Sequence, residues 1–189
     1  MLFHNPLLGL LIIFGTPISA NLNHAQTKAC QAVFSPEAMK QSCCPPMDQF
    51  VERIRNCQKE SSSSVFSCSV SKCVTTIYGI TTNNKIDEKK CRALLKRLTK
   101  EDKASEPLNK MIEKNCLNGQ YKKYVTSDVK CDTMKYQVCA YVNYLLGCVE
   151  FNKTPRSCKK IAKNVKTCKP VLDQYLKKIN SKRCNRCHP

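Results

Sequence analysis

The residues best suited to chemistry in this sequence are its 15 cysteines, all of which lie after residue 29. Thiols can hold a metal, attack a substrate or form disulfides. Cys184-Asn-Arg-Cys187-His188 has the spacing of a c-type haem attachment site, but it stands at the end of a chain rich in cysteines, and we expect Cys184 and Cys187 to tie down the tail instead. The chain has 3 histidines in all. This scarcity argues against zinc sites and against Ser-His or Cys-His nucleophiles. We therefore expect no catalytic residue, no metal and no cofactor.

The N-terminal residues favour disulfides as the role of these thiols. An apolar run over 7–14 is followed by Gly15, Pro17 and the small pair Ser19-Ala20. This pattern is typical of a secretory signal peptide at residues 1–20, and it is too short to span a membrane. A secreted, extracellular chain meets an oxidising compartment. Because 15 is odd, one cysteine should be unpaired or pair with another chain.

The remaining residues, 21–189, predict a single all-α domain of about six to eight helices. Glycine is rare, with 5 residues, and the alternation of apolar and polar residues that marks strands is missing. Apolar residues recur at helical spacing, and we expect helices at about 47–57, 65–79, 88–98, 105–116, 132–149 (the longest), 156–169 and 171–179. Pro170 should break or bend the chain. Residues 21–42 and 120–130 should be irregular.

Two cysteines of the 132–149 helix should join it to different neighbours. Cys139 and Cys148 have eight residues between them. Nine residues make about two and a half helical turns, so the two sulfurs point to opposite sides.

Here the chain resembles the insect odorant-binding proteins. Cys139 and Cys148 match the fifth and sixth framework cysteines, and the first four are similar to Cys44, Cys68, Cys73 and Cys116. Further cysteines resemble those of the Plus-C subclass, namely Cys43 in Cys43-Cys44-Pro45-Pro46, Cys131, Cys158 and Cys168. The resemblance covers about residues 30–168. The chain departs from the family with four residues between Cys68 and Cys73 and with Val149 where proline is usual, so it would be a divergent member.

The resemblance implies an interlocked set of disulfides, Cys44–Cys73, Cys68–Cys139 and Cys116–Cys148. It also implies a core at about 43–150 and a disulfide-tethered extension at 151–189. We expect the other cysteines to be bridged as well, at Cys30, Cys43, Cys57, Cys131, Cys158, Cys168, Cys184 and Cys187. Cys91 has no counterpart in the family scheme, and it shares an apolar helix face with Leu94 and Leu98. A buried free thiol fits this position, and a bridge between two chains is the alternative.

The family's function is to carry small hydrophobic molecules, such as odorants and pheromones, in an internal apolar pocket. The charge-free stripes of the expected helices are compatible with such a pocket. Its candidate lining residues are Val70, Val74, Ile77, Leu94, Leu98, Met111, Val138, Tyr141, Val142, Leu145 and Val149. Tyr141 could orient a polar group of the ligand. The alternative is that these residues form only a core.

A strong positive charge suggests a second function. The chain has 32 Lys and Arg against 14 Asp and Glu, a formal charge of +18. Residues 151–189 hold 12 basic residues and one acid, Asp173. The protein could thus be a cationic effector or antimicrobial protein acting through its surface, or the charge could serve solubility alone. Expected partners are a small hydrophobic ligand and either a membrane odorant receptor or an anionic surface, but no nucleic acid, for a monomer or weak homodimer.

Overall fold

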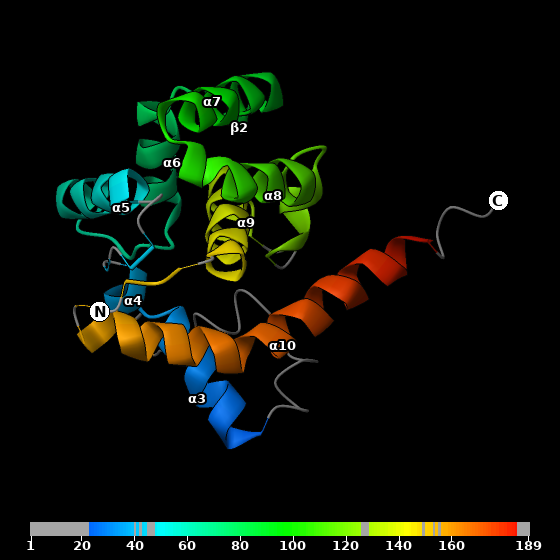
Figure 1. Cartoon of the computed structure of the whole chain (residues 1–189). Coiled ribbons are helices and arrows are strands. Elements are labelled where there is room, and N and C mark those ends of the chain that lie inside the picture. The colour runs from blue at the N-terminus through cyan, green and yellow to red at the C-terminus, as the bar shows by residue number, and fades with distance from the viewer. Residues whose placement is uncertain are drawn as a thin grey trace.

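The computed structural model describes residues 23–39, 41, 43–44, 48–125, 129–148, 150–152, 154 and 156–184. These residues form an all-α domain in which six disulfides are seen, and the sequence predicts this fold class (Figure 1). The larger helices are α3 (His24–Val33), α5 (Asp48–Ser61), α6 (Cys68–Ile77), α7 (Glu88–Glu101), α8 (Glu106–Cys116), α9 (Asp132–Gly147) and α10 (Arg156–Cys184). Shorter elements are α4 (Pro36–Met39), the turns of 3-10 helix η2 (Lys103–Ser105) and η3 (Gln120–Lys123), and the hairpin β1 (Thr81–Thr82) and β2 (Lys85–Ile86).

Helix α9 is the centre of the molecule. Every residue from Tyr136 to Leu145 is buried, so the helix is enclosed on all sides rather than along one stripe. Helices α6 and α8 pack against it, and α7 packs against α8 (Figure 1). One of the polar side chains that this burial includes, Asn143, is hydrogen-bonded to neighbouring elements. Asn143 accepts from Asn115 Nδ2 at 2.6 Å and donates to Tyr124 Oη at 3.0 Å.

A second layer consists of α3, α4 and α10, which lie together below α9 in Figure 1. The expectation that residues 21–42 are irregular is wrong, because α3 and α4 occupy much of this segment. The reason is a capping box. Asn23 Oδ1 accepts from the Gln26 amide at 2.8 Å, and Gln26 Oε1 accepts from the Asn23 amide at 3.2 Å. The apolar face of α3, with Ala29, Cys30 and Val33, is buried.

The expected break at Pro170 is also wrong, because α10 is one helix of 29 residues with Pro170 inside it. It is therefore longer than α9, which was expected to be the longest helix. Proline removes one amide donor from the helix and leaves one carbonyl without its helical partner. Pro170 is exposed, so water can reach this turn. The opposite face, with Cys158, Ile161, Val165 and Cys168, is buried, and tertiary packing against α3 holds the helix together. In the segment 120–130, which the sequence predicts to be irregular and polar, residues 120–123 form η3, and Tyr121, Tyr124 and Val125 are buried. Residues 124–125 and 129–130 are irregular as expected, and residues 126–128 lie outside the described part of the chain.

The three disulfides implied by the family resemblance are not the observed ones. Cys44 pairs with Cys148 rather than Cys73, because it lies beside the end of α9. Cys73 pairs with Cys57, which α5 presents to α6. Cys68 pairs with Cys131 at the start of α9, and Cys116 pairs with Cys139 at the α8–α9 contact. Two further disulfides attach α10, Cys30–Cys168 and Cys43–Cys158.

Other predictions about the cysteines agree with the structure. Cys139 and Cys148 join α9 to two different partners, α8 and Cys44. Cys91 is free and buried. The residues expected to form a signal peptide, 1–20, lie outside what the structure describes, as do the Cys184 side chain and Cys187.

Candidate ligand-binding cavity

A cavity of about 300 Å³ lies among α5, α6, α7, α8 and α9. Its wall is mainly aliphatic and aromatic, which suits a hydrophobic ligand. The apolar and aromatic lining residues are Phe50, Val74, Tyr78, Ile80, Leu94, Leu95, Leu98, Ile112, Tyr136 and Ala140. The polar lining residues are Asp48, Gln49, Thr75, Glu101, Asp102, Ser105, Asn109 and Gln137.

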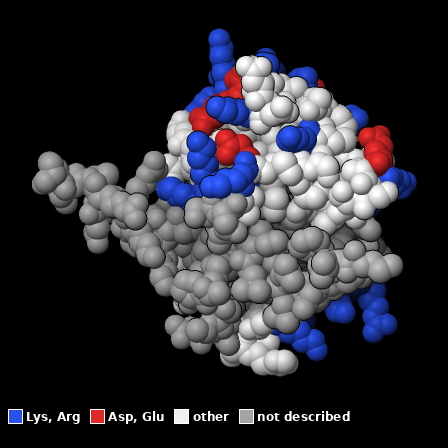
Figure 2. Space-filling view, turned by 180° about the vertical axis from the view of Figure 1, so that it is seen from behind, with Lys and Arg blue, Asp and Glu red and all other residues white. Residues whose placement is uncertain are grey.

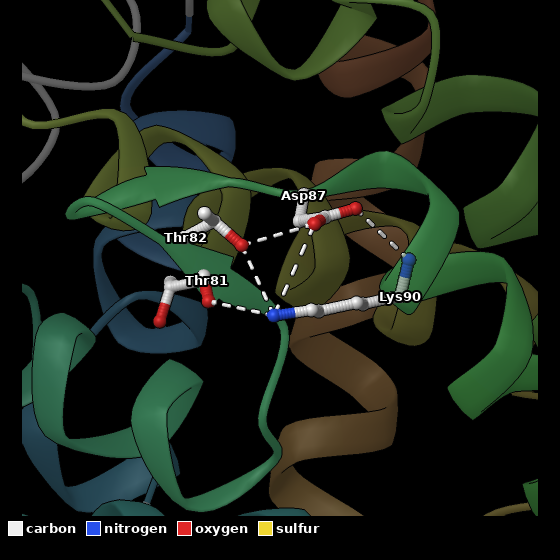
Figure 3. Close-up of polar contacts among 4 residues, drawn as sticks. All are labelled: Thr81, Thr82, Asp87 and Lys90. Carbon is white, nitrogen blue, oxygen red and sulfur yellow. Dashed lines mark hydrogen bonds and ion pairs between the residues drawn. The ribbon is translucent and has the colours of Figure 1, made fainter.

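Helix α7 contributes Leu94, Leu95 and Leu98 to this wall, and the β1–β2 hairpin fixes where the helix begins. Asp87 caps α7 by accepting from the Lys90 amide at 3.1 Å and from Thr82 Oγ1 at 3.0 Å (Figure 3). Lys90 Nζ reaches back to Thr82 Oγ1 at 3.0 Å and to the Thr81 carbonyl at 3.4 Å (Figure 3). These hydrogen bonds, led by the Lys90 amide, lower the pKa of Asp87. The hairpin thereby holds Ile80, just before β1, close to the start of α7.

The hairpin turn itself follows from its two asparagines. Asn83 and Asn84 have φ values of 52° and 59°, in the left-handed region that asparagine tolerates better than most residues. Between the expected helices at 65–79 and 88–98, the structure thus has a short antiparallel ladder that pairs Thr81 with Ile86 and Thr82 with Lys85.

A buried amide network ties α7 to α8 at one side of the cavity. Asn109 Nδ2 donates to Ser105 Oγ at 2.8 Å and to Thr99 Oγ1 at 3.0 Å. Ser105 Oγ in turn donates to the Asp102 carbonyl at 2.7 Å. Polar groups of this wall are therefore largely occupied within the protein, which leaves the cavity surface predominantly apolar.

Gln137 on α9 differs from these residues. Its Nε2 donates to the Val65 carbonyl at 3.0 Å, and this contact fixes the orientation of the amide because a carbonyl can only accept. Gln137 Oε1 is enclosed and has no hydrogen-bond partner among the described residues. The residue also lines the cavity. An unsatisfied buried acceptor is costly, so a donor on a bound molecule would be favourable here.

Behind the wall, Tyr136 separates the cavity from the free thiol. Its side chain interacts with that of Cys91, which is fully buried. Burial raises the pKa of Cys91 to about 11, so the thiol stays neutral near pH 7. A neutral, enclosed thiol is a weak nucleophile, and Cys91 acts here as part of the packing.

The mouth of the cavity carries charge and aromatic rings. Asp48, Gln49, Glu101 and Asp102 are exposed there. Phe50 and Tyr78 stack with ring centroids 6.4 Å apart. Burial raises the pKa of Tyr78, and the positive charges of Arg53 and Arg97 oppose this rise. The rim is therefore polar while the interior is apolar.

The candidate lining residues from sequence fall into three groups. Val74, Leu94 and Leu98 line the cavity. Five others are buried elsewhere in the core: Val70, Val138, Tyr141, Val142 and Leu145. Met111 is half-buried outside the cavity lining, Ile77 is 45% exposed, and Val149 lies outside the described residues.

Tyr141 illustrates why helical periodicity alone misplaces residues. Its hydroxyl donates to the Val33 carbonyl at 2.8 Å, and its ring contacts Phe34 and Phe66 with centroids 5.9 and 5.8 Å apart. It therefore joins α9 to the α3–α10 layer on the side away from the cavity. Burial raises its pKa. The lining residues that sequence reasoning missed include Phe50, Tyr78, Ile112 and Gln137. Of these, Phe50 and Ile112 lie within the helices expected at 47–57 and 105–116.

Comparison with family models, curated proteins and solved structures finds no match for this chain. Within the described residues, no helix combines the length and apolar character needed to cross a membrane.

Proposed function

We propose that this protein is a secreted, non-enzymatic carrier that reversibly binds small hydrophobic molecules in the α5–α9 cavity. The observation that carries the proposal is the apolar cavity of about 300 Å³ with a polar rim. This volume is at the lower end of the range for ligand sites, so the ligand is a small molecule of the size of an odorant or pheromone.

The order of the disulfides supports the resemblance to odorant-binding proteins if the six framework cysteines are assigned to a different set of residues than the sequence suggested. Six cysteines of the central part of the chain are Cys57, Cys68, Cys73, Cys116, Cys131 and Cys139. Within this set the first pairs with the third, the second with the fifth and the fourth with the sixth. This is the interlocked order that the family resemblance implies, on different cysteines. The spacing of seven residues between Cys131 and Cys139, instead of eight, remains a departure.

The size of the cavity sets the expected affinity. Burial of about ten methylenes at ~0.8 kcal/mol each contributes on the order of 8 kcal/mol before the costs of association. A net free energy of that size corresponds to a Kd of about 1 μM, so a somewhat weaker value is expected. Such binding permits both uptake and release.

Gln137 favours ligands with one hydrogen-bond donor, such as alcohols, over ethers and hydrocarbons. Its free Oε1 would accept from a ligand hydroxyl after small side-chain shifts at the cavity wall. We expect a ten-carbon alcohol to bind about three- to tenfold more tightly than its methyl ether, the strength of one net hydrogen bond. Equal affinities would contradict the role of Gln137.

The direct test is titration of the oxidised protein, lacking residues 1–20, with the fluorescent probe N-phenyl-1-naphthylamine. Saturable binding near one site per chain, with displacement by ten-carbon alcohols, is expected. Ala140→Leu places a larger side chain in the cavity wall and should weaken probe binding at least tenfold. Ala93→Leu makes the same change at an exposed position of α7 and should not. Absence of saturable binding, or equal loss in both variants, would contradict the proposal.

A further inference from the structure

The solvent face of α10 carries a line of positive charge, here called the α10 ridge. It consists of Arg156, Lys159, Lys160, Lys163, Lys166 and Lys169, all exposed. Arg156, Lys160, Lys163 and Lys166 follow one another at intervals of three or four residues, so they share one helix face. At a rise of 1.5 Å per residue, these four span about 15 Å.

No acid interrupts the ridge. The nearest acidic residue of the helix is Asp173, and no ion pair involving the six ridge residues occurs in the described part of the chain. Helix α7 is a useful contrast because it also carries six Lys and Arg. There, Lys90, Arg92 and Arg97 pair with carboxylates, and acids stand at both ends of the helix. On the face in Figure 2, acidic side chains lie in the upper part among Lys and Arg, while the charged side chains in the lower part are all basic.

The ridge is rigid and it lacks large apolar side chains. Cys30–Cys168 and Cys43–Cys158 attach α10 to the N-terminal segment. The larger apolar side chains over 156–172 are buried, at Ile161, Val165, Val171 and Leu172. Interfacial helices insert large apolar side chains into lipid, whereas the exposed apolar residue on this face is the small Pro170. It also has no aromatic side chain over 156–174 on which a nucleobase could stack.

We propose that the α10 ridge binds a linear sulfated polysaccharide, a glycosaminoglycan chain of the extracellular matrix. Sulfates spaced along such a chain would lie against cations spaced along the helix, and release of counterions would drive association. The interaction does not depend on the cavity, because no residue of α3 or α10 lines it. A carrier held on a matrix by this face would still have its cavity free to exchange ligand.

Two variants of equal charge test the proposal. One carries Lys160→Gln, Lys163→Gln and Lys166→Gln on α10, and the other carries Lys89→Gln, Lys96→Gln and Lys100→Gln at exposed positions of α7. On immobilised heparin, the α10 variant should elute at clearly lower salt and bind about tenfold or more weakly in solution. The α7 variant should stay close to wild type. Both should bind N-phenyl-1-naphthylamine as the wild type does, which separates this test from that of the cavity.

Several outcomes would overturn the proposal. Equal weakening by the two variants would mean that net charge alone attracts the polyanion. Undiminished binding to desulfated heparin would exclude sulfate recognition. Tighter binding to vesicles of phosphatidylserine and phosphatidylcholine, or to single-stranded DNA, than to heparin at the same ionic strength would assign the ridge to a membrane or to nucleic acid.

Discussion

Removal of the Cys30–Cys168 disulfide tests whether the contribution of one disulfide to the free energy of unfolding depends on the other disulfides. The two cysteines are 138 residues apart. The chain-entropy model assigns about 5 kcal/mol to a loop of that length. With Cys43–Cys158 intact, however, the loop that is opened contains only residues 30–43 and 158–168, roughly 25 residues in all. The same model then gives about 3.5 kcal/mol.

The matched comparison is the Cys57–Cys73 disulfide, whose sequence separation is 16. No other disulfide shortens that loop, and the model gives about 3 kcal/mol. The double variants Cys30→Ala/Cys168→Ala and Cys57→Ala/Cys73→Ala should therefore lose similar free energies of unfolding, within about 0.5 kcal/mol. Guanidinium unfolding followed by circular dichroism measures both. A difference near 2 kcal/mol, with the longer loop more costly, would show that the disulfides act separately and would refute this reasoning.

Three further predictions follow from single residues. Since burial raises the pKa of Cys91 to about 11, a neutral thiol reagent at pH 8 should label it slowly in the native protein and rapidly in denaturant; rapid stoichiometric labelling of the native form would contradict its burial. Asn143→Ala should lower the free energy of unfolding by about 2 kcal/mol in a denaturant titration, because it leaves Asn115 Nδ2 and the Tyr124 hydroxyl without a shared partner. The lowered pKa of Asp87 stabilises the fold above its ordinary pKa of 3.8, and this contribution is lost as the pH falls through the folded-state pKa. Asp87→Asn should therefore show a shallower decrease of Tm from pH 5 to pH 2 than wild type, and an unchanged slope would contradict the contribution of this carboxylate.

Local patterns in the sequence were sufficient for the helices from α5 to α9, but not for α3 and α4, for the continuity of α10 or for the contacts between helices. The N-cap at Asp87 and the apolar spacing of Cys91, Leu94 and Leu98 predict α7, because capping and amphipathicity are properties of neighbouring residues. The same signals existed for α3, where Asn23 and Gln26 form a capping box. The weak apolar periodicity of that segment concealed it.

Disulfide partners and cavity walls depend on how helices dock, which periodicity does not encode. The family resemblance implied that Cys139 pairs with Cys68, whereas docking of α8 on α9 brings Cys139 to Cys116. Likewise, Val74 and Tyr141 both lie on buried helix faces. Only the position of the α3–α10 layer decides that Val74 faces the cavity and Tyr141 faces Val33.

The disulfides divide the protein into two layers with separable roles. Cys57–Cys73, Cys68–Cys131 and Cys116–Cys139 close within α5–α9, the helices that surround the cavity. Cys30–Cys168, Cys43–Cys158 and Cys44–Cys148 each join the N-terminal segment to the end of α9 or to α10. The outer set therefore fixes the layer that carries the α10 ridge without contributing to the cavity wall. Substitutions in one layer should leave the other function intact, because additivity holds for sites that share no partners. One variant can combine Ala140→Leu with Lys160→Gln, Lys163→Gln and Lys166→Gln. Its probe affinity should fall by the same factor as in the Ala140→Leu variant, and its heparin affinity by the same factor as in the α10 variant. A marked departure of either affinity from these values would show that the layers are coupled.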